Sequence, residues 1–294
     1  MLQKRWKMHS LNDKYPFLIK YLDNAVTSGN MAHCILFYGS DIEAQYELAL
    51  EAARMLNCKE SHSADCQCLN CNWIRENKHP AVLTYTRFDN RAAADEGKKG
   101  ANISIDQAHE IKNNLLVSSD YHRVLIFCDR DKEGGVITGL NQVNFTEPTA
   151  NALLKTFEEP PSNTTFFFLT KDKSDVITTV VSRAQCFYVP SMKEEDRDFS
   201  LVKDAMEGYL ELERSEVLDF NNKILELVKM YDAQQVFTEM QNYIENLLRA
   251  NLDNMSLKVK LIADLHAIEE AKKQNRLNMN VQTIVENLCF KLIL

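Results

Sequence analysis

The sequence predicts an α/β domain built on a parallel sheet and, after it, an all-helical region. Over about the first 190 residues, short apolar runs alternate with segments of helical spacing, the pattern of a parallel sheet covered on both faces. From Met192 onward, five segments keep helical spacing, and neither a glycine after Gly208 nor a proline after Pro190 interrupts them. We therefore expect a helical bundle over 191–294.

The elements of the first domain follow in order. We expect one amphipathic helix over 10–29, with Phe17 on its apolar face, then a strand over 34–38, a turn at Gly39 and a helix that ends near Cys58. Ser104 with Gln107 has the capping-box spacing that starts a helix. Further strands are expected at 81–85, 123–128, 165–170 and 185–189, a loop at 87–101, and a helix before Pro160.

The composition is that of an ordinary soluble protein. The 294 residues include 34 basic and 42 acidic side chains, and this net charge of −8 does not favour a stand-alone nucleic-acid binder. No run approaches the roughly 18 apolar residues of a membrane span. The basic start leads into the polar stretch HSLNDKY rather than the apolar segment of a signal peptide. We therefore expect a cytoplasmic protein.

The turn after the first strand stands where a phosphate-binding loop would lie, but its residues do not fit. In the pattern GxxxxGK[ST], backbone N–H groups and a lysine hold phosphates, and a hydroxyl holds Mg²⁺. Counted from Gly39, the second glycine, the lysine and the hydroxyl are replaced by Ala44, Gln45 and Tyr46. Asp41 and a second carboxylate two residues on also repel an anion. These residues predict a vestigial loop, although many strand-turn-helix units with one glycine look similar.

Asp129 ends the strand RVLIFC, where a Walker B motif would place an aspartate for Mg²⁺ and then a glutamate to orient water. Arg130 stands in the glutamate position, so the hydrolytic carboxylate is absent. The alternative, that the strand simply ends in an aspartate, stays open.

Eight cysteines divide into two groups. Four fall within fourteen residues as C-x7-C-x-C-x2-C, and in a reducing compartment this points to a metal rather than to disulfides. We expect a structural zinc with thiolates at about 2.3 Å, His62 being the reserve ligand; plain thiols are the alternative. The expected ligands are Cys58, Cys66, Cys68 and Cys71. The scattered cysteines at 34, 128, 186 and 289 are expected to be buried free thiols.

Taken in order, these residues resemble the clamp-loader family of bacterial DNA polymerase III, which contains AAA+ subunits of the delta-prime and gamma/tau types. The resemblance rests on HCILFYG (33–39), on LNC (56–58) and above all on NALLKTFEEPP (151–161). The Ser-Arg-Cys motif of the family corresponds to Ser182, Arg183 and Ala184. The spacer after Asp129 is longer by about ten residues, which we interpret as a surface loop insertion, and the inner cysteine pair is tighter than in the family.

The resemblance implies an AAA+ domain over 1–190 with a zinc module inserted at 58–71, and a collar bundle over 191–294 with an abbreviated lid if one is present. The missing loop lysine implies a delta-prime-like subunit of the polymerase III holoenzyme with no nucleotide cofactor and no ATPase activity of its own. Arg183 would then act as an arginine finger in a neighbouring ATPase site, with Ser182 orienting its turn and Thr170 at a vestigial sensor position. The implied partners are the gamma/tau and delta subunits and, through the complex, the sliding clamp and primer-template DNA.

The residues disfavour two other functions. An active P-loop ATPase of the gamma/tau type is disfavoured because Gln45 leaves no fixed cation for the β- and γ-phosphates. A zinc-dependent nucleic-acid binder is disfavoured by the acidic charge balance.

Overall fold

The computed structural model describes residues 8–87, 103–130, 135–137, 145, 147–173, 176–191 and 199–293. The chain divides into two compact units, Met1–Ser191 and Met192–Leu294, which are described separately. Nearly all of the loop expected at 87–101, and most of the insertion expected after Asp129, lie outside the described residues.

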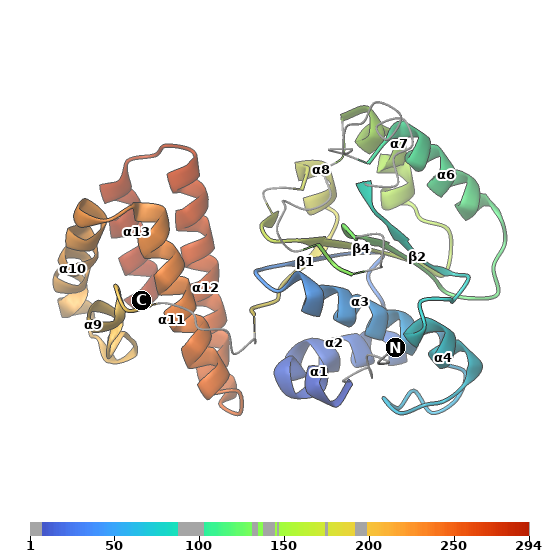
Figure 1. The fold of residues 1–294 in the computed structure, drawn as a ribbon, viewed down its shortest axis with the longest axis horizontal. Coiled ribbons are helices and arrows are strands. Elements are labelled where there is room, and N and C mark those ends of the chain that lie inside the picture. Colours follow the sequence, from blue (N-terminus) through green and yellow to red (C-terminus); the bar gives the residue numbers. More distant parts are fainter. Residues whose placement is uncertain are drawn as a thin grey trace. The chain divides into compact units, whose positions relative to one another are not determined.

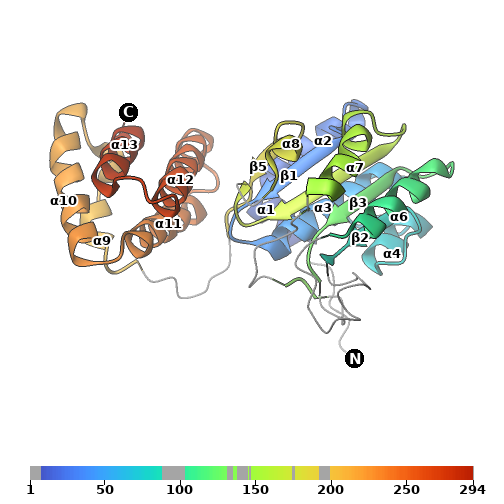
Figure 2. The same ribbon diagram turned by 90° about the horizontal axis from the view of Figure 1, so that it is seen from above.

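A five-stranded sheet forms the centre of the first unit (Figure 2). Its order is β2-β3-β4-β1-β5, and every pair is parallel, as expected from the alternating pattern. β1 and β4 are buried along their whole length, which explains their continuous apolar runs. The strands are β1 (Cys34–Tyr38), β2 (Val82–Tyr85), β3 (Arg123–Phe127), β4 (Thr164–Thr170) and β5 (Gln185–Tyr188).

Helices cover both faces of this sheet (Figure 1). One face carries α1 (Met8–Lys14), α2 (Pro16–Thr27), α3 (Ile42–Asn57) and α4 (Leu69–Arg75), and the other carries α6 (Ile105–Leu116), α7 (Glu147–Glu158) and α8 (Thr178–Val181). Under α7, the ring of Phe168 stacks on Phe127 at 5.0 Å and meets Phe157 edge-on at 5.3 Å. Aromatic packing of this kind anchors α7 to the sheet.

The expected single helix over 10–29 is wrong, because the chain forms two helices that break at Tyr15. Pro16 is the physical reason: it lacks a backbone N–H and takes the first position of α2, where that group has no partner anyway. Leu18 and Leu22 are buried, whereas Phe17, expected on the apolar face, is 51% exposed.

Local signals were more accurate at α6. The Ser104 hydroxyl accepts from the backbone N–H of Gln107 at 3.2 Å, and the Gln107 side chain accepts from the backbone N–H of Ser104 at 3.0 Å. The capping box predicted from these two residues is therefore confirmed.

The expectation that all four scattered cysteines are buried is wrong for Cys186. Cys34, Cys128 and Cys289 are buried free thiols, but Cys186 is exposed. It lies on β5, the last strand of the sheet, where one flank has no neighbouring strand among the described residues. An apolar run such as QCFYV predicts a strand but not its place in the sheet.

The described part of the second unit is helical. Two single 3₁₀ turns accompany α9 (Lys203–Met206), α10 (Val217–Met230), α11 (Ala233–Ala250), α12 (Met255–Arg276) and α13 (Val281–Ile293). Asp232 and Asn254 cap α11 and α12 through their side chains. The core between the helices includes Phe237, Ile244 and Ile268, which are fully buried. Among the helices that the structure describes, none has both the length and the apolar content to span a membrane.

Candidate functional site

The turn between β1 and α3 lies at the carboxyl ends of the parallel strands, where α/β domains bind their ligands. Gly39 allows this turn to form: its φ is +136°, and a Cβ atom there would lie 2.3 Å from the carbonyl oxygen of Val189. Only glycine fits such a close approach of two backbone segments. The turn is therefore packed against the end of β5.

Gln45, in the position of the missing lysine, points back into this turn and is fully buried. Its side-chain amide donates to the carbonyl oxygen of Gly39 at 3.0 Å and to that of Thr170 at 3.1 Å. Its side-chain oxygen accepts from the backbone N–H of Thr170 at 3.1 Å. The amide thus binds the ends of β1 and β4 together, in the place where a lysine would face phosphate.

Asp41 fills the amino end of α3. Its carboxylate accepts from the backbone N–H of Ala44 at 3.0 Å, and the side chain is buried. In a phosphate-binding loop, the N–H groups at this helix end would face the anion. Here the carboxylate of Asp41 is the negative group at the amino end of α3, so the partial positive charge of the N–H groups there is already compensated.

The side chains at the expected positions of the Mg²⁺ hydroxyl and the catalytic glutamate contact each other. The Arg130 guanidinium, in the place of the catalytic glutamate, lies 4.9 Å from the ring centre of Tyr46, in the place of the Mg²⁺ hydroxyl. The Tyr46 hydroxyl in turn lies 3.2 Å from the hydroxyl of Thr84 on β2. A cation over an aromatic face is a favourable contact, and here it links α3 to the segment that follows β3.

Asp129 is fully buried and forms an ion pair with Arg87 at 2.8 Å. Burial raises the pKa of the Asp129 carboxyl, and the Arg87 guanidinium and the Thr86 hydroxyl oppose that shift. A protein cation thus stands beside the carboxylate that a Walker B motif would use for Mg²⁺.

The turn between α8 and β5 presents Arg183, which is about one-third exposed. Its guanidinium pairs with the carboxylate of Glu158 on α7 and donates to the carbonyl oxygen of Thr179 at 2.9 Å. The hydroxyl of Ser182 accepts from the same guanidinium at 3.3 Å and donates to the Thr179 carbonyl at 3.1 Å. Ser182 and Glu158 therefore hold Arg183 in one orientation at the surface of the first unit.

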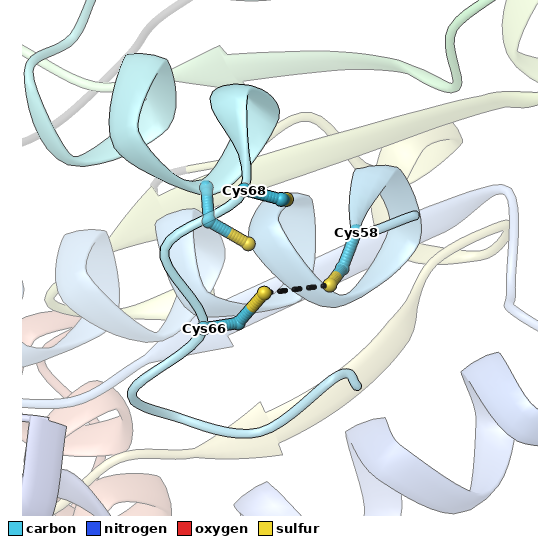
Figure 3. Close-up of side chains that lie close together, drawn as sticks. Cys58, Cys66 and Cys68 are labelled. Atoms are coloured by element: carbon cyan, nitrogen blue, oxygen red, sulfur yellow. Dashed lines mark hydrogen bonds between the residues drawn. The ribbon is translucent and has the colours of Figure 1, made fainter. Parts of the chain in front are cut away.

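The four clustered cysteines meet between the end of α3 and the start of α4. Cys58, Cys66 and Cys68 point toward one another (Figure 3), and the sulfurs of Cys58 and Cys66 are 3.6 Å apart. All four sulfur atoms, that of Cys71 included, lie within 4.8 Å of one another. A tetrahedral zinc with bonds of about 2.3 Å needs sulfurs roughly 3.8 Å apart. The cluster therefore fits a thiolate-bound metal, and His62, the reserve ligand, is not part of it.

The thiols of this cluster differ in acidity. Burial raises the pKa of Cys68, but hydrogen bonds from the backbone of Cys71 and Lys59 outweigh that effect and lower the pKa to about 7. Burial and the neighbouring thiol of Cys68 raise the pKa of Cys71. The thiol of Cys68 therefore ionises readily, whereas the buried thiol of Cys71 needs a cation beside it to ionise.

Sequence reasoning missed the partners that complete these sites. Thr170, expected at a sensor position, also holds the side chain of Gln45 through its backbone N–H and carbonyl groups. The acidic character of Asp41 was part of the sequence prediction, but its role as the N-cap of α3 was not. Glu158, within NALLKTFEEPP, was not connected with Arg183, because nothing in a single sequence shows a contact across 25 residues.

Fold and site together define the class: an α/β domain with a five-stranded parallel sheet and a closed turn after its first strand, joined to a helical unit. A family model described as "DNA polymerase III, delta subunit" matches residues 14–193, and the chain belongs to this family of clamp-loader subunits. The resemblance noted from its motifs is thereby confirmed.

Curated relatives agree with this family. The delta' subunit of Escherichia coli (strain K12) is 26% identical over 67% of this chain and 57% of the relative. The delta' subunit of Bacillus subtilis (strain 168) is 28% identical over 61% of this chain and 48% of the relative. A gamma subunit of Buchnera aphidicola is 23% identical over 88% of this chain and 64% of the relative. The chain thus spans between 48% and 64% of the length of these three relatives.

Among solved structures, a gamma subunit-related protein of Thermotoga maritima overlaps 94% of this chain and 98% of its own, at 19% identity and a TM-score of 0.38. The Bacillus subtilis DNA clamp loader delta protein overlaps 94% of this chain and 99% of its own, at 11% identity and a TM-score of 0.35. TM-scores this low carry no argument about function.

Proposed function

We propose that this chain is a delta-prime-like subunit of the replicative clamp loader that does not hydrolyse ATP and that acts on the ATPase site of a neighbour. Its partners would be the gamma/tau and delta subunits, and it would reach the sliding clamp and primer-template DNA through the complex. The observation that carries the proposal is the side chain of Gln45, bonded to Gly39 and Thr170 where a nucleotide-binding lysine would stand.

Charge and hydrogen bonding both oppose nucleotide binding in this turn. A triphosphate would have to displace three hydrogen bonds of a fully buried amide and would face the buried carboxylate of Asp41. Leaving buried backbone groups unpaired costs about 1–3 kcal/mol each. Because position 45 is a glutamine and not a lysine, no cation there pairs with the β- and γ-phosphates to offset this free-energy cost.

Arg183 supports the second half of the proposal. A guanidinium stays charged at any physiological pH and can form two parallel bonds to phosphate oxygens. Arg183 is partly exposed, and Glu158 and Ser182 orient it; in the assembly its guanidinium would exchange the bond to Glu158 for the γ-phosphate of an adjacent subunit. Fingers of this kind are worth roughly 10³ to 10⁵ in rate in GTPase systems.

The same proposal assigns roles to the zinc module and the helical unit. Cys58, Cys66, Cys68 and Cys71 would hold a structural zinc ion, which would fix the segment between α3 and α4. The helices after residue 191 would form the collar that joins sister subunits, with residues 1–190 as the AAA+ domain. A chain cut after Ser191 that still assembles with its partners would contradict the collar role.

The test is a clamp loader reconstituted with Arg183→Ala. The variant should assemble normally. The clamp- and DNA-stimulated ATPase rate of the complex should fall by the fraction that comes from the one ATPase site that Arg183 contacts. Arg183→Lys should restore little of that rate, because an ammonium group lacks the two-pronged geometry. Lys155→Ala, which removes an exposed cation from α7, is the matched control and should leave the rate unchanged. Wild-type ATPase and clamp loading by the Arg183→Ala complex would remove this residue from the mechanism.

A further inference from the structure

We propose that Arg54 is a positioning residue for the four-cysteine site, which it supports with its charge and with bonds to both flanks of the site. The inference rests on the proposed zinc site and adds a residue to it that the cysteine spacing does not predict. Arg54 lies in the last turn of α3, one turn before Cys58, and only 1% of it is exposed. A fully buried arginine needs a specific set of partners.

All five N–H groups of Arg54 have an acceptor. Two pair with the carboxylate of Glu51, at 2.9 and 2.7 Å. Two donate to the carbonyl oxygens of His62 and Ser63, both at 2.9 Å. The fifth donates to the sulfur of Cys71 at 3.7 Å. One side chain therefore ties α3 to the loop that precedes Cys66 and to a sulfur of the cluster.

The positive charge of Arg54 would offset negative charge at the metal site. A zinc ion with four thiolate ligands keeps two uncompensated negative charges, and a buried site of that charge needs positive groups and N–H donors around its sulfurs. Arg54 supplies both at Cys71. Glu51 holds the guanidinium in place through a two-bond ion pair, the geometry that fixes an arginine most firmly.

Arg75 provides a matched comparison. It also holds the loop, through the carbonyl oxygen of Ala64 at 2.9 Å, and it binds the side chain of Asn72 at 3.0 Å. It donates to no sulfur of the cluster. Both arginines hold the loop, but of the two only Arg54 places its charge at a cysteine sulfur. Comparing their variants therefore separates the effect of loop support from the effect of charge at the sulfur.

The experiment measures Zn²⁺ affinity of the full chain by competition with a chromophoric chelator, together with the visible spectrum of the Co²⁺-loaded protein. Arg54→Met should weaken zinc binding by about 10- to 100-fold, the usual effect of removing a group that supports a metal ligand. It should also shift the sulfur-to-cobalt charge-transfer band, which a merely structural defect would leave in place. Arg54→Lys should recover part of the affinity, and Arg75→Met should retain wild-type affinity and spectrum.

Because Arg54→Met leaves Glu51 buried without its partner, the double variant Glu51→Leu with Arg54→Met is measured as well. It removes both buried charges together and should show the same loss of affinity and the same spectral shift. Wild-type affinity and spectrum in Arg54→Met or in the double variant would overturn the inference while leaving the zinc site intact. A wild-type chain that binds no zinc would overturn the site itself, and this inference with it.

Discussion

Replacing Gln45 with alanine should destabilise the first unit by about 2–5 kcal/mol. The variant loses three hydrogen bonds of a fully buried amide and leaves the N–H of Thr170 without that partner, which costs about 1–3 kcal/mol. The removed amide group also leaves a cavity at the ends of β1 and β4, and this adds a loss on the order of 1–2 kcal/mol.

Urea unfolding followed by circular dichroism measures this loss. Gln185→Ala is the control: Gln185 is exposed and accepts one side-chain bond, from the Tyr21 hydroxyl, so its loss should cost about 1 kcal/mol or less. Gln45→Lys keeps a long side chain but supplies no acceptor for Thr170, and it should be destabilised as well. If Gln45→Ala were as stable as the control, the side chain of Gln45 would not be what holds the turn after β1 to the end of β4.

Three further predictions concern other parts of the first unit. Gly39→Ala should lower stability by about 3 kcal/mol or more in thermal unfolding, because of its positive φ and the 2.3 Å approach to Val189; a neutral substitution would contradict this. Burial and the nearby His33 lower the pKa of His122 to about 4, so the unfolded chain takes up the proton first as the pH falls. Stability should therefore fall by about 1 kcal/mol between pH 7 and 5.5, allowing for partial exposure, and His122→Gln should remove this part of the pH dependence. Protein purified without chelator should contain close to one zinc per chain, and Cys71→Ser should contain much less; a wild-type chain with far less than one zinc would refute the metal assignment.

The sheet was predictable because its signals are local or periodic. The buried strands appear as apolar runs such as CILFY, and the capping box of α6 needs only two residues three apart. Pro16 is a local signal as well, and the single helix expected over 10–29 is wrong because this proline starts a second helix.

The sites were predictable only in part, for a physical reason. The four cysteines are close in sequence, so their spacing sufficed to bring them together. The bond between Gln45 and Thr170 spans 125 residues, and the pair of Arg183 with Glu158 spans 25. Contacts of this kind depend on strand order and on helix packing. Periodicity does not contain that information.

The most direct test of the proposal that this chain does not use ATP is a calorimetric titration of the isolated chain with ATP and Mg²⁺, followed by a steady-state phosphate-release assay. The closed turn around Gln45 and the paired Asp129 predict no binding at micromolar concentrations and no phosphate release above the buffer rate. A micromolar dissociation constant together with steady turnover would contradict the account and would favour an active ATPase of the gamma/tau type.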